Sequence, residues 1–515
     1  MTGLIAQDVI QAKRPPPVSL RRTRTAPSIQ DHLLTKHAIP RHFPKLVTSE
    51  ARHLTASKTA LEETLDTYRR DTLDIPFVTI DPRNAISLDD AIYVEKQSDG
   101  SWYTATALTD VASAVAPDTH IDREAFQRAS TFHVYPKVIR MLPHVISENS
   151  SSLLPRVTRP ALIFEAKYSP DGEMLSQEFS HGLIRSRKKH SYESFHEWVS
   201  RGHRFAIDIV ECHDILKRQS SNADSAYRSR NLIIDDHRDD IEYCEESGRN
   251  AVSEFMLRVN ANMSTFVEEA GVPQIYRVNG PGYRPEDYKK ARIRLRELGY
   301  ALPKNARDCS WQILSDIVEE SHVQGNSDAV IRILQERIAS RSFFSANNTG
   351  HFTLGVDRYA LFSSPLQRYS DIFNQRAMHT ALGKTGFGLS QIEIENIHSI
   401  CGQLNQNDEV RRRIRRDRRR YELLKEMKSL EGQRATFFVA DINERAVDFL
   451  VPSNGLRVAY TFNEQSGTTA EKLDNNSFRV SRNDDAPLTL SRRDRVRLQI
   501  ESVDPLQGEM KVCPF

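Results

Sequence analysis

The sequence has few features of membrane-bound or disulfide-stapled proteins. It contains no run of about 18 uncharged apolar residues, so no transmembrane helix is predicted and we expect no membrane association. Its cysteines lie far apart and form no C-x-x-C pair. They are Cys212, Cys244, Cys309, Cys401 and Cys513. This spacing argues against a structural zinc site and against a disulfide framework, and it predicts a reducing, cytoplasmic setting.

The N-terminal part of the chain lacks the pattern of a secretory signal. Residues 1–30 are basic and contain prolines but have no apolar centre, which favours a flexible arm; an organelle transit segment is the alternative. A helix is predicted to follow, with Thr48 or Ser49 as its N-cap. We therefore interpret residues 1–73 as a basic, proline-containing arm and helical lead-in.

The chain also lacks an excess of charge of one sign, since its formal net charge is +2. Its arginines are nevertheless concentrated, because the stretch VRRRIRRDRRR places eight of them within residues 411–420. Such a block on a predicted helix favours contact with nucleic-acid phosphates, since each neutralised phosphate releases a counterion. A solvated, charged helix is the alternative. The binding candidates in this block are Arg411, Arg412, Arg415 and Arg416.

Three aspartates lie between two strand-like runs in FVTIDPRNAISLDDAIYVEK, residues 77–96. Asp81 ends the first predicted strand, and Asp89 and Asp90 precede the second. Hydrolysis of a phosphodiester with bound metal ions requires several carboxylates at one point, because Mg²⁺ prefers hard oxygen ligands. Adjacent side chains in a regular strand point to opposite faces, so both Asp89 and Asp90 reach one site only from a bent loop. An ordinary acidic turn is the alternative.

A second candidate segment is SSPLQRYSD, residues 363–371. Ser363 or Ser364 can cap a helix with Pro365 in its first position, which places Arg368 in the first turn. A cation there is opposed by the positive end of the helix dipole, so an anion such as phosphate is expected beside it. Pairing of Arg368 with Asp371 is the alternative. Nearby aromatic residues that could stack on bases are Tyr359, Phe362 and Tyr369.

The C-terminal part, residues 432–515, changes to short β-rich runs separated by Asn, Asp, Gly and Ser turns. Five such runs fit a small barrel of the OB type, and a small β-sandwich is the alternative. The predicted fold class is α+β. The predicted domains are a catalytic domain over residues 74–385, a helical segment with the arginine-rich run over residues 386–431, and an OB-like RNA-binding barrel over residues 432–515.

The motifs together resemble the ribonuclease II (RNB-domain) family of 3′→5′ exoribonucleases. The resemblance rests on the "ID … DDA" segment, on "GHF-x-LG … Y … SP-x-x-RY-x-D … R", and on intervening stretches such as KKHSYESF, over roughly residues 74–385. It implies an RNB-type fold that degrades single-stranded RNA to 5′-mononucleotides with Mg²⁺, or Mn²⁺ as an alternative.

The resemblance also implies roles for individual residues. Asp81, Asp89 and Asp90 match motif aspartates that hold the metal and act on the scissile phosphate, and Arg368 matches a catalytic basic residue. The positions implied to contact RNA are Tyr135, Tyr192, Gln367, Arg368 and Tyr369. Tyr192 and Tyr135 correspond to aromatics at the terminal nucleotides.

Three positions depart from the family pattern. Ser87 stands where the family usually has an aspartate, Gln367 where it has the first of two basic residues, and Ser253 where it often has an acid. Loss of charged contacts to a transition state reduces rates strongly. The first hypothesis is an active exoribonuclease; the alternative is a catalytically impaired RNB-family RNA-binding protein. A structural role without RNA is third. The N-terminal barrels usual in the family are not expected, and protein partners are not predicted.

Overall fold

The computed structural model divides into two compact units. The larger comprises residues 39–415, and the smaller comprises residues 1–38 with 416–515. The structure describes residues 28–56, 70–134, 137–222, 246–279, 285–309, 311–326, 329–330, 333–334, 341–351, 354, 356–384, 386–462, 468–473, 477–482 and 487–513. Each unit is described separately below.

A seven-stranded sheet forms the centre of the larger unit, in the order β1-β8-β7-β4-β3-β2-β9. The pairs β1–β8 and β2–β9 are parallel and the others antiparallel. Its strands are β1 (Arg70–Asp71), β2 (Val78–Asp81), β3 (Asp90–Lys96), β4 (Trp102–Thr109), β7 (Thr158–Tyr168), β8 (Met174–Arg185) and β9 (Lys188–Ser191). The two strands predicted beside the acidic segment are therefore confirmed as β2 and β3.

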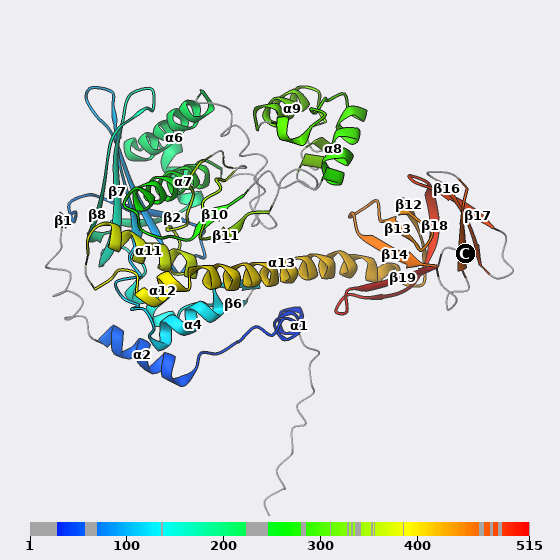
Figure 1. The fold of residues 1–515 in the computed structure, drawn as a ribbon, viewed down its shortest axis with the longest axis horizontal. Coiled ribbons are helices and arrows are strands. Elements are labelled where there is room, and N and C mark those ends of the chain that lie inside the picture. Colours follow the sequence, from blue (N-terminus) through cyan, green and yellow to red (C-terminus); the bar gives the residue numbers. More distant parts are fainter. Residues whose placement is uncertain are drawn as a thin grey trace, which may run out of the picture. The chain divides into compact units, whose positions relative to one another are not determined.

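Apolar residues alternate between the two faces of this sheet, as the period of two in a strand requires. On β3, Ile92 and Val94 pack in the core beneath three helices, whereas Ala91 belongs to a separate cluster that also contains Leu153. The three helices are α5 (Tyr192–Ser200), α6 (Arg204–Asn222) and α7 (Glu246–Glu269). Figure 1 shows α6 and α7 lying beside the sheet. Helix α7 ends at Glu269, and Gly271 just beyond it has the positive φ typical of a helix stop.

A second core joins helices that are distant in the sequence. Its helices are α2 (Lys45–Ala56), α4 (His120–Arg128), α11 (Tyr369–Ala381) and the beginning of α13 (Ile397–Met427). Helix α2 already begins at Lys45, so Thr48 and Ser49 lie inside it and the predicted N-cap is wrong; the Thr48 hydroxyl instead donates to the Lys45 carbonyl within the helix. The part of the predicted helix after Ala56 lies outside the described residues.

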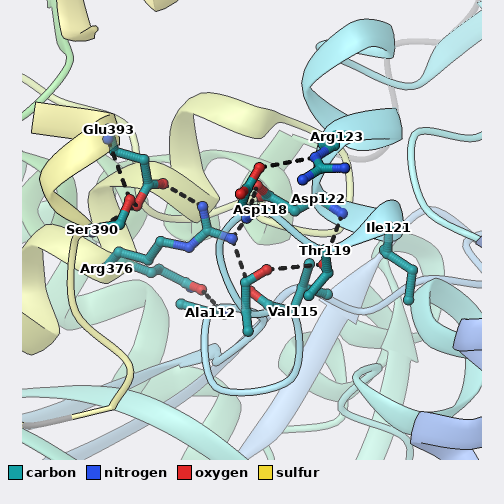
Figure 2. A network of polar contacts seen from close by, with 12 residues as sticks. Ala112, Val115, Asp118, Thr119, Ile121, Asp122, Arg123, Arg376, Ser390 and Glu393 are labelled. Atoms are coloured by element: carbon teal, nitrogen blue, oxygen red, sulfur yellow. Dashed lines mark hydrogen bonds and ion pairs between the residues drawn. The ribbon is translucent and has the colours of Figure 1, made fainter. Parts of the chain in front are cut away.

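Arg376 is fully buried and ties α11 to two neighbouring elements, as Figure 2 shows. Its guanidinium donates to Asp122 Oδ1 on α4 at 2.7 Å, to the Val115 carbonyl at 2.8 Å, and to Glu393 of α12 (Gln391–Glu395). A buried cation needs such partners because an unpaired charge in a core is very costly. This network fixes the position of α11 in the larger unit.

The remaining elements of the larger unit are short or belong to a separate small cluster. Two two-stranded sheets pair β5 with β6 and β10 with β11, and α8 and α9 contribute to an apolar cluster of their own. The bounds are β5 (Phe132–Val134), β6 (Lys137–Ile139), β10 (Tyr276–Val278), β11 (Phe343–Ser345), α8 (Pro285–Glu297), α9 (Trp311–Val323), a π-helix (Ile146–Ser150) and a 3₁₀ turn (Ala306–Asp308).

The smaller unit contains the predicted barrel. Its five strands pair in the order β14-β13-β12-β18-β19 and form a nearly closed antiparallel OB-like barrel. They are β12 (Arg434–Ile442), β13 (Ala446–Leu450), β14 (Arg457–Thr461), β18 (Arg495–Asp504) and β19 (Glu509–Cys513), which are the five runs expected from the sequence. A further sheet of β15 (Thr468–Lys472), β16 (Ser477–Arg482) and β17 (Leu488–Ser491) was not predicted. The unit also contains α1 (Ile29–Lys36) and a 3₁₀ turn (Lys428–Leu430).

In the described part of the chain, no helix combines the length and the apolar composition needed to cross a membrane.

Candidate active site

The three predicted aspartates lie at one end of two neighbouring strands of the central sheet, here called the sheet edge. Asp81 is the last residue of β2 and Asp90 is the first of β3, and these neighbouring strands run antiparallel. Asp89 precedes β3 in the connecting loop, where Thr109 N donates to its carbonyl at 2.8 Å. The charges of the three carboxylates act on one another, which shows that the acids lie close together. Ser87 lies in the same loop and is partly buried.

The electrostatics of this cluster favour bound positive charge. Burial raises the pKa of Asp81 from 3.8 to about 7, and the charge of Asp89 adds to the rise. Burial raises the pKa of Asp89 to about 6 despite its hydrogen bonds. For Asp90, burial and the charges of both other aspartates raise the pKa well above its usual range. Each carboxylate is thus destabilised as an anion, chiefly by burial, and the charges of Lys189 near Asp81 and of Arg368 near Asp89 compensate only in part.

The donor set of this cluster fits a hard divalent cation. The Oδ2 atom of Asp81 is buried and has no hydrogen-bond partner, and no side-chain hydrogen bond reaches Asp90 within the described residues. Carboxylate oxygens are the ligands that Mg²⁺ prefers, and a divalent ion would relieve the mutual repulsion. Asp81 and Asp90 would supply the carboxylate oxygens that hold the ion, and Asp89 would supply charge beside them.

Asp89 is held in place by the second predicted segment. Leu366 N donates to its Oδ1 at 2.9 Å, and the Gln367 amide donates to its Oδ2 at 2.8 Å. The Gln367 side chain also lies 3.3 Å from His133 Nε2 through its Oε1 atom. Gln367 therefore orients the carboxylate as a neutral donor, without adding positive charge.

Helix α11 begins later than the sequence predicted. Residues 365–367 form a turn, and the helix begins at Tyr369 with Arg368 at the N-cap in an extended conformation. The cause is the turn closed by Gln367 N and Arg368 N on the Ser364 carbonyl, each at 3.0 Å. The Asp371 carboxylate, in the first turn of the helix, accepts from Ser364 N at 2.7 Å and provides the negative charge expected near a helix N-terminus.

Arg368 is paired with Asp371, which is the alternative that the sequence left open. Its Nε and a terminal nitrogen donate to the two oxygens of Asp371 at 2.8 and 2.6 Å. Burial lowers the pKa of Arg368, but the charge of Asp371 and its hydrogen bonds, with smaller contributions from Tyr359 and Asp89, raise the pKa overall, so Arg368 stays charged. A terminal nitrogen of Arg368 also lies 3.4 Å from Ser363 Oγ, and the Asn260 amide on α7 donates to the same oxygen at 3.1 Å.

Two further residues lie near Asp81: Lys189 on the neighbouring strand β9, and Tyr192 directly after that strand. Asp81 pairs in register with Ser191 on β9, and Tyr192 follows as the first residue of α5, so that partly buried aromatic stands at the same sheet edge. Lys189, also on β9, lowers the pKa of Asp81 through its charge and donates to the Ala85 carbonyl. Sequence reasoning did not single out Lys189 or Asn260, although both fall within stretches that carried the family resemblance.

Other predicted RNA contacts are placed differently. Tyr369 is buried and packs against Phe126 at a ring-centroid distance of 5.3 Å, so this placement gives no support to a contact with RNA. Tyr135 lies outside the described residues. Arg411 and Arg412 donate to Asp408 on their own helix, α13, at 2.7 and 3.3 Å.

Arg411 and Arg368 nevertheless line one small cavity in the larger unit, together with Ser130 and Phe344. Arg415 and Arg416 follow on α13; Arg415 is partly buried and Arg416 is exposed. RNA contacts by Arg411, Arg412, Arg415 and Arg416 therefore stay a prediction.

Comparison with known proteins assigns the family. The RNB domain profile matches residues 69–384, and the chain therefore belongs to the RNB domain family. The sequence is 29% identical over 376 residues to ribonuclease R of Escherichia coli (strain K12), which covers 69% of this chain and 45% of that protein. The chain spans about half the length of the curated relatives it matches.

The fold is similar to solved structures of the same kind. Mycoplasma genitalium RNase R in complex with ribose methylated single-stranded RNA superposes with a TM-score of 0.76 at 19% identity, covering 95% of this chain and 77% of that one. Yeast Ssd1, a pseudonuclease, superposes with a TM-score of 0.63 at 17% identity, covering 82% and 54%. At these identities the likeness shows the fold.

Proposed function

We propose that this protein is a Mg²⁺-dependent 3′→5′ exoribonuclease that hydrolyses single-stranded RNA to 5′-mononucleotides, with Mn²⁺ as an alternative metal. The observation that carries the proposal is the convergence of Asp81, Asp89 and Asp90 at one sheet edge, beside the arginine at the N-terminus of α11. The family relationship and the E. coli ribonuclease R relative support the same activity. The cytoplasmic location stays a prediction.

The residues of the chain divide the work. When bound, Mg²⁺ supplies Lewis-acid activation of water and neutralises charge on the scissile phosphate. Asp81 and Asp90 would hold it, and Asp89, fixed by Leu366 N and Gln367, would keep a third negative charge beside it. Arg368 would contact the phosphate while Asp371 fixes its direction, and Tyr192 would stack on the terminal base.

The test follows 5′-labelled single-stranded RNA with purified protein on a denaturing gel, with Mg²⁺ or with EDTA. Progressive shortening from the 3′ end that requires metal and is lost in Asp90→Asn is the expected result. Asp99→Asn is the matched control, because it makes the same chemical change on an exposed turn between β3 and β4. Equal turnover by Asp90→Asn would contradict the proposed site.

A catalytically impaired RNA-binding protein is the second candidate. It is favoured by Gln367, which gives Asp89 a neutral partner where the family usually has a cation, and by Ser87 in the acidic loop. A pseudonuclease of this fold exists in yeast Ssd1. Intact RNA on the denaturing gel, with a mobility shift on a native gel, would select this candidate. No shift and no shortening would leave neither function standing.

A further inference from the structure

A second group of possible metal ligands lies in the core of the larger unit, apart from the acids at the sheet edge. It consists of Asp110, His181 and His379, here called the His–Asp cluster. Asp110 follows the last residue of β4, His181 lies on β8 and His379 lies on α11. At most 3% of each residue is exposed. Charged side chains are almost never fully buried without a partner, so the burial of Asp110 between two histidines requires a physical cause.

The ligand atoms converge on one carboxylate oxygen. The Nε2 atoms of His181 and His379 each lie 2.9 Å from Asp110 Oδ2, and the three possible ligand atoms all lie within 4.8 Å of one another. His379 makes an aligned hydrogen bond, whereas His181 Nε2 is as close without a hydrogen-bond geometry. The rings meet edge to face at a centroid distance of 4.8 Å. Both imidazoles thus face the same point.

Hydrogen bonding alone accounts for little of this arrangement. His181 Nε2, although 2.9 Å from Asp110 Oδ2, is buried without an aligned hydrogen bond, and the Nδ1 atom of each ring is buried without a partner in the described structure. Buried polar atoms are nearly always satisfied, so the unaligned Nε2 atom of His181, directed at a carboxylate, points to a ligand missing between the two rings. A metal ion bound by both Nε2 atoms would use their lone pairs and replace the short contacts to Asp110.

The surrounding residues hold the three ligands rigidly. The Gln375 amide oxygen on α11 accepts from Val111 N and Ala112 N at 3.0 and 3.3 Å, and its nitrogen donates to the Thr109 carbonyl at 2.7 Å. Gln375 precedes His379 by one helical turn and therefore fixes the backbone on either side of Asp110. Ser113 N donates to Asp110 Oδ1 at 3.2 Å, which leaves Oδ2 directed at the histidines. Such outer contacts orient metal ligands.

We propose that the His–Asp cluster binds one zinc ion through Asp110 Oδ2 and the Nε2 atoms of His181 and His379, with a water molecule in the fourth position. Two imidazoles and one carboxylate select a first-row transition metal over Mg²⁺, which prefers oxygen ligands. Zinc ligand bonds of about 2.0–2.2 Å place tetrahedral ligand atoms roughly 3.3 Å apart. The two separations of 2.9 Å from Asp110 Oδ2 to the Nε2 atoms would therefore widen by a few tenths of an ångström on binding. The Phe387 ring, 5.5 Å from that of His379 between centroids, provides an apolar cover.

The proposed zinc site stands independently of the exoribonuclease activity. Zinc would join β4, β8 and α11, and α11 begins at the turn that holds Asp89. Zinc is therefore expected to stabilise the fold without contacting RNA. No cysteine is required, which is why the scattered cysteines of the sequence gave no indication of it.

The first test measures zinc bound per chain by elemental analysis after equilibration with Zn²⁺ and excess Mg²⁺, which competes for the acidic site. One zinc ion per chain is expected for the wild type, and a loss of at least tenfold for His181→Ala and Asp110→Asn. His213→Ala is the matched control, because His213 is also buried beside an aspartate, with Nδ1 2.9 Å from Asp214. Zinc content that is unaffected by the cluster variants, or no zinc in folded wild type, would overturn the proposal.

A second measurement remains decisive if a cluster variant fails to fold. Co²⁺ replaces zinc in wild-type protein, and tetrahedral coordination by imidazole and carboxylate gives visible absorption bands. We expect these bands together with a rise in the thermal unfolding midpoint on adding Zn²⁺ to metal-free protein. Weak octahedral bands and an unchanged midpoint would show that the cluster is a hydrogen-bonded core and not a metal site.

Discussion

Replacing Asp81 with asparagine should stabilise the metal-free protein at pH 8. The carboxylate of Asp81 is largely buried beside two other acids, and burial raises its pKa from 3.8 to about 7. Between about pH 4 and 7 the folded state therefore binds more protons than the unfolded state, so the free energy of unfolding falls as the pH rises through this range. Above about pH 7 Asp81 is ionised in the folded protein, and its destabilising effect on the fold no longer grows with pH. Asparagine resembles the neutral form of the aspartate, so the substitution removes this destabilisation.

The magnitude follows from the size of the pKa change. One pH unit corresponds to about 1.4 kcal/mol, so the rise from 3.8 to about 7 is worth at most about 4 kcal/mol. Although one carboxylate oxygen of Asp81 is buried, the residue as a whole is only partly buried, so solvent screening reduces this upper limit to about 2 kcal/mol. Mg²⁺ should stabilise the wild type by offsetting the same repulsion, and should stabilise Asp81→Asn less.

The assay is urea unfolding of wild type and Asp81→Asn at pH 5 and pH 8, with EDTA or with Mg²⁺. In EDTA the variant should be the more stable protein at pH 8, and its advantage should shrink at pH 5. Asp99→Asn, on an exposed turn, should show the same difference in stability between pH 5 and pH 8 as the wild type, because hydrogen bonds from Ser101 lower the pKa of Asp99 and keep it ionised at both. If Asp81→Asn is less stable than wild type in EDTA at pH 8, then the acids do not repel one another and the reasoning fails.

The remaining predictions concern charges placed elsewhere in the larger unit. Arg376→Met should lower the free energy of unfolding by about 3–5 kcal/mol, because it leaves Asp122 and Glu393 buried without their cation; Arg123→Met, which breaks an exposed pair, should leave the urea midpoint nearly unchanged. Gln367→Arg should steepen the dependence of log Kd for single-stranded RNA on log salt by about 0.7, the slope of one phosphate contact, and an unchanged slope would place position 367 away from RNA. Replacing Arg411 and Arg412 together by glutamine should flatten that dependence by less than about 0.7 per arginine, since both already pair with Asp408. A decrease of the full 0.7 per arginine would mean that both side chains leave Asp408 and bind phosphate.

Strand patterns and the acidic segment were predictable because their signals are local. Alternating apolar residues around Asp81 and Asp90 gave β2 and β3, and the five C-terminal runs gave the barrel strands. Helix starts were less predictable. Pro365 suits the first turn of a helix, but the hydrogen bonds of Gln367 N and Arg368 N to the Ser364 carbonyl close a separate turn and delay α11 to Tyr369.

Contacts between distant residues left no local signal. Nothing around Gln367 indicates that its amide holds Asp89, and the ligands of the His–Asp cluster come from two strands and a helix that are far apart in the sequence. Tyr369 shows a second limit of sequence reasoning, since nothing in its motif indicates that the helix turns this aromatic residue into the core. Family resemblance identified which segments meet, whereas the direction of each side chain required the structure.

Helix α11 has a consequence for how the chain tolerates change in length. Asp371 at its beginning, Arg376 in its middle and His379 near its end face three different partners, and their directions are fixed by their spacing along one helix. One inserted residue turns everything beyond it by about 100°. A single-residue insertion after Asp371 would therefore misdirect Arg376 and His379 together, so in evolution this helix should accept substitutions far more readily than insertions or deletions.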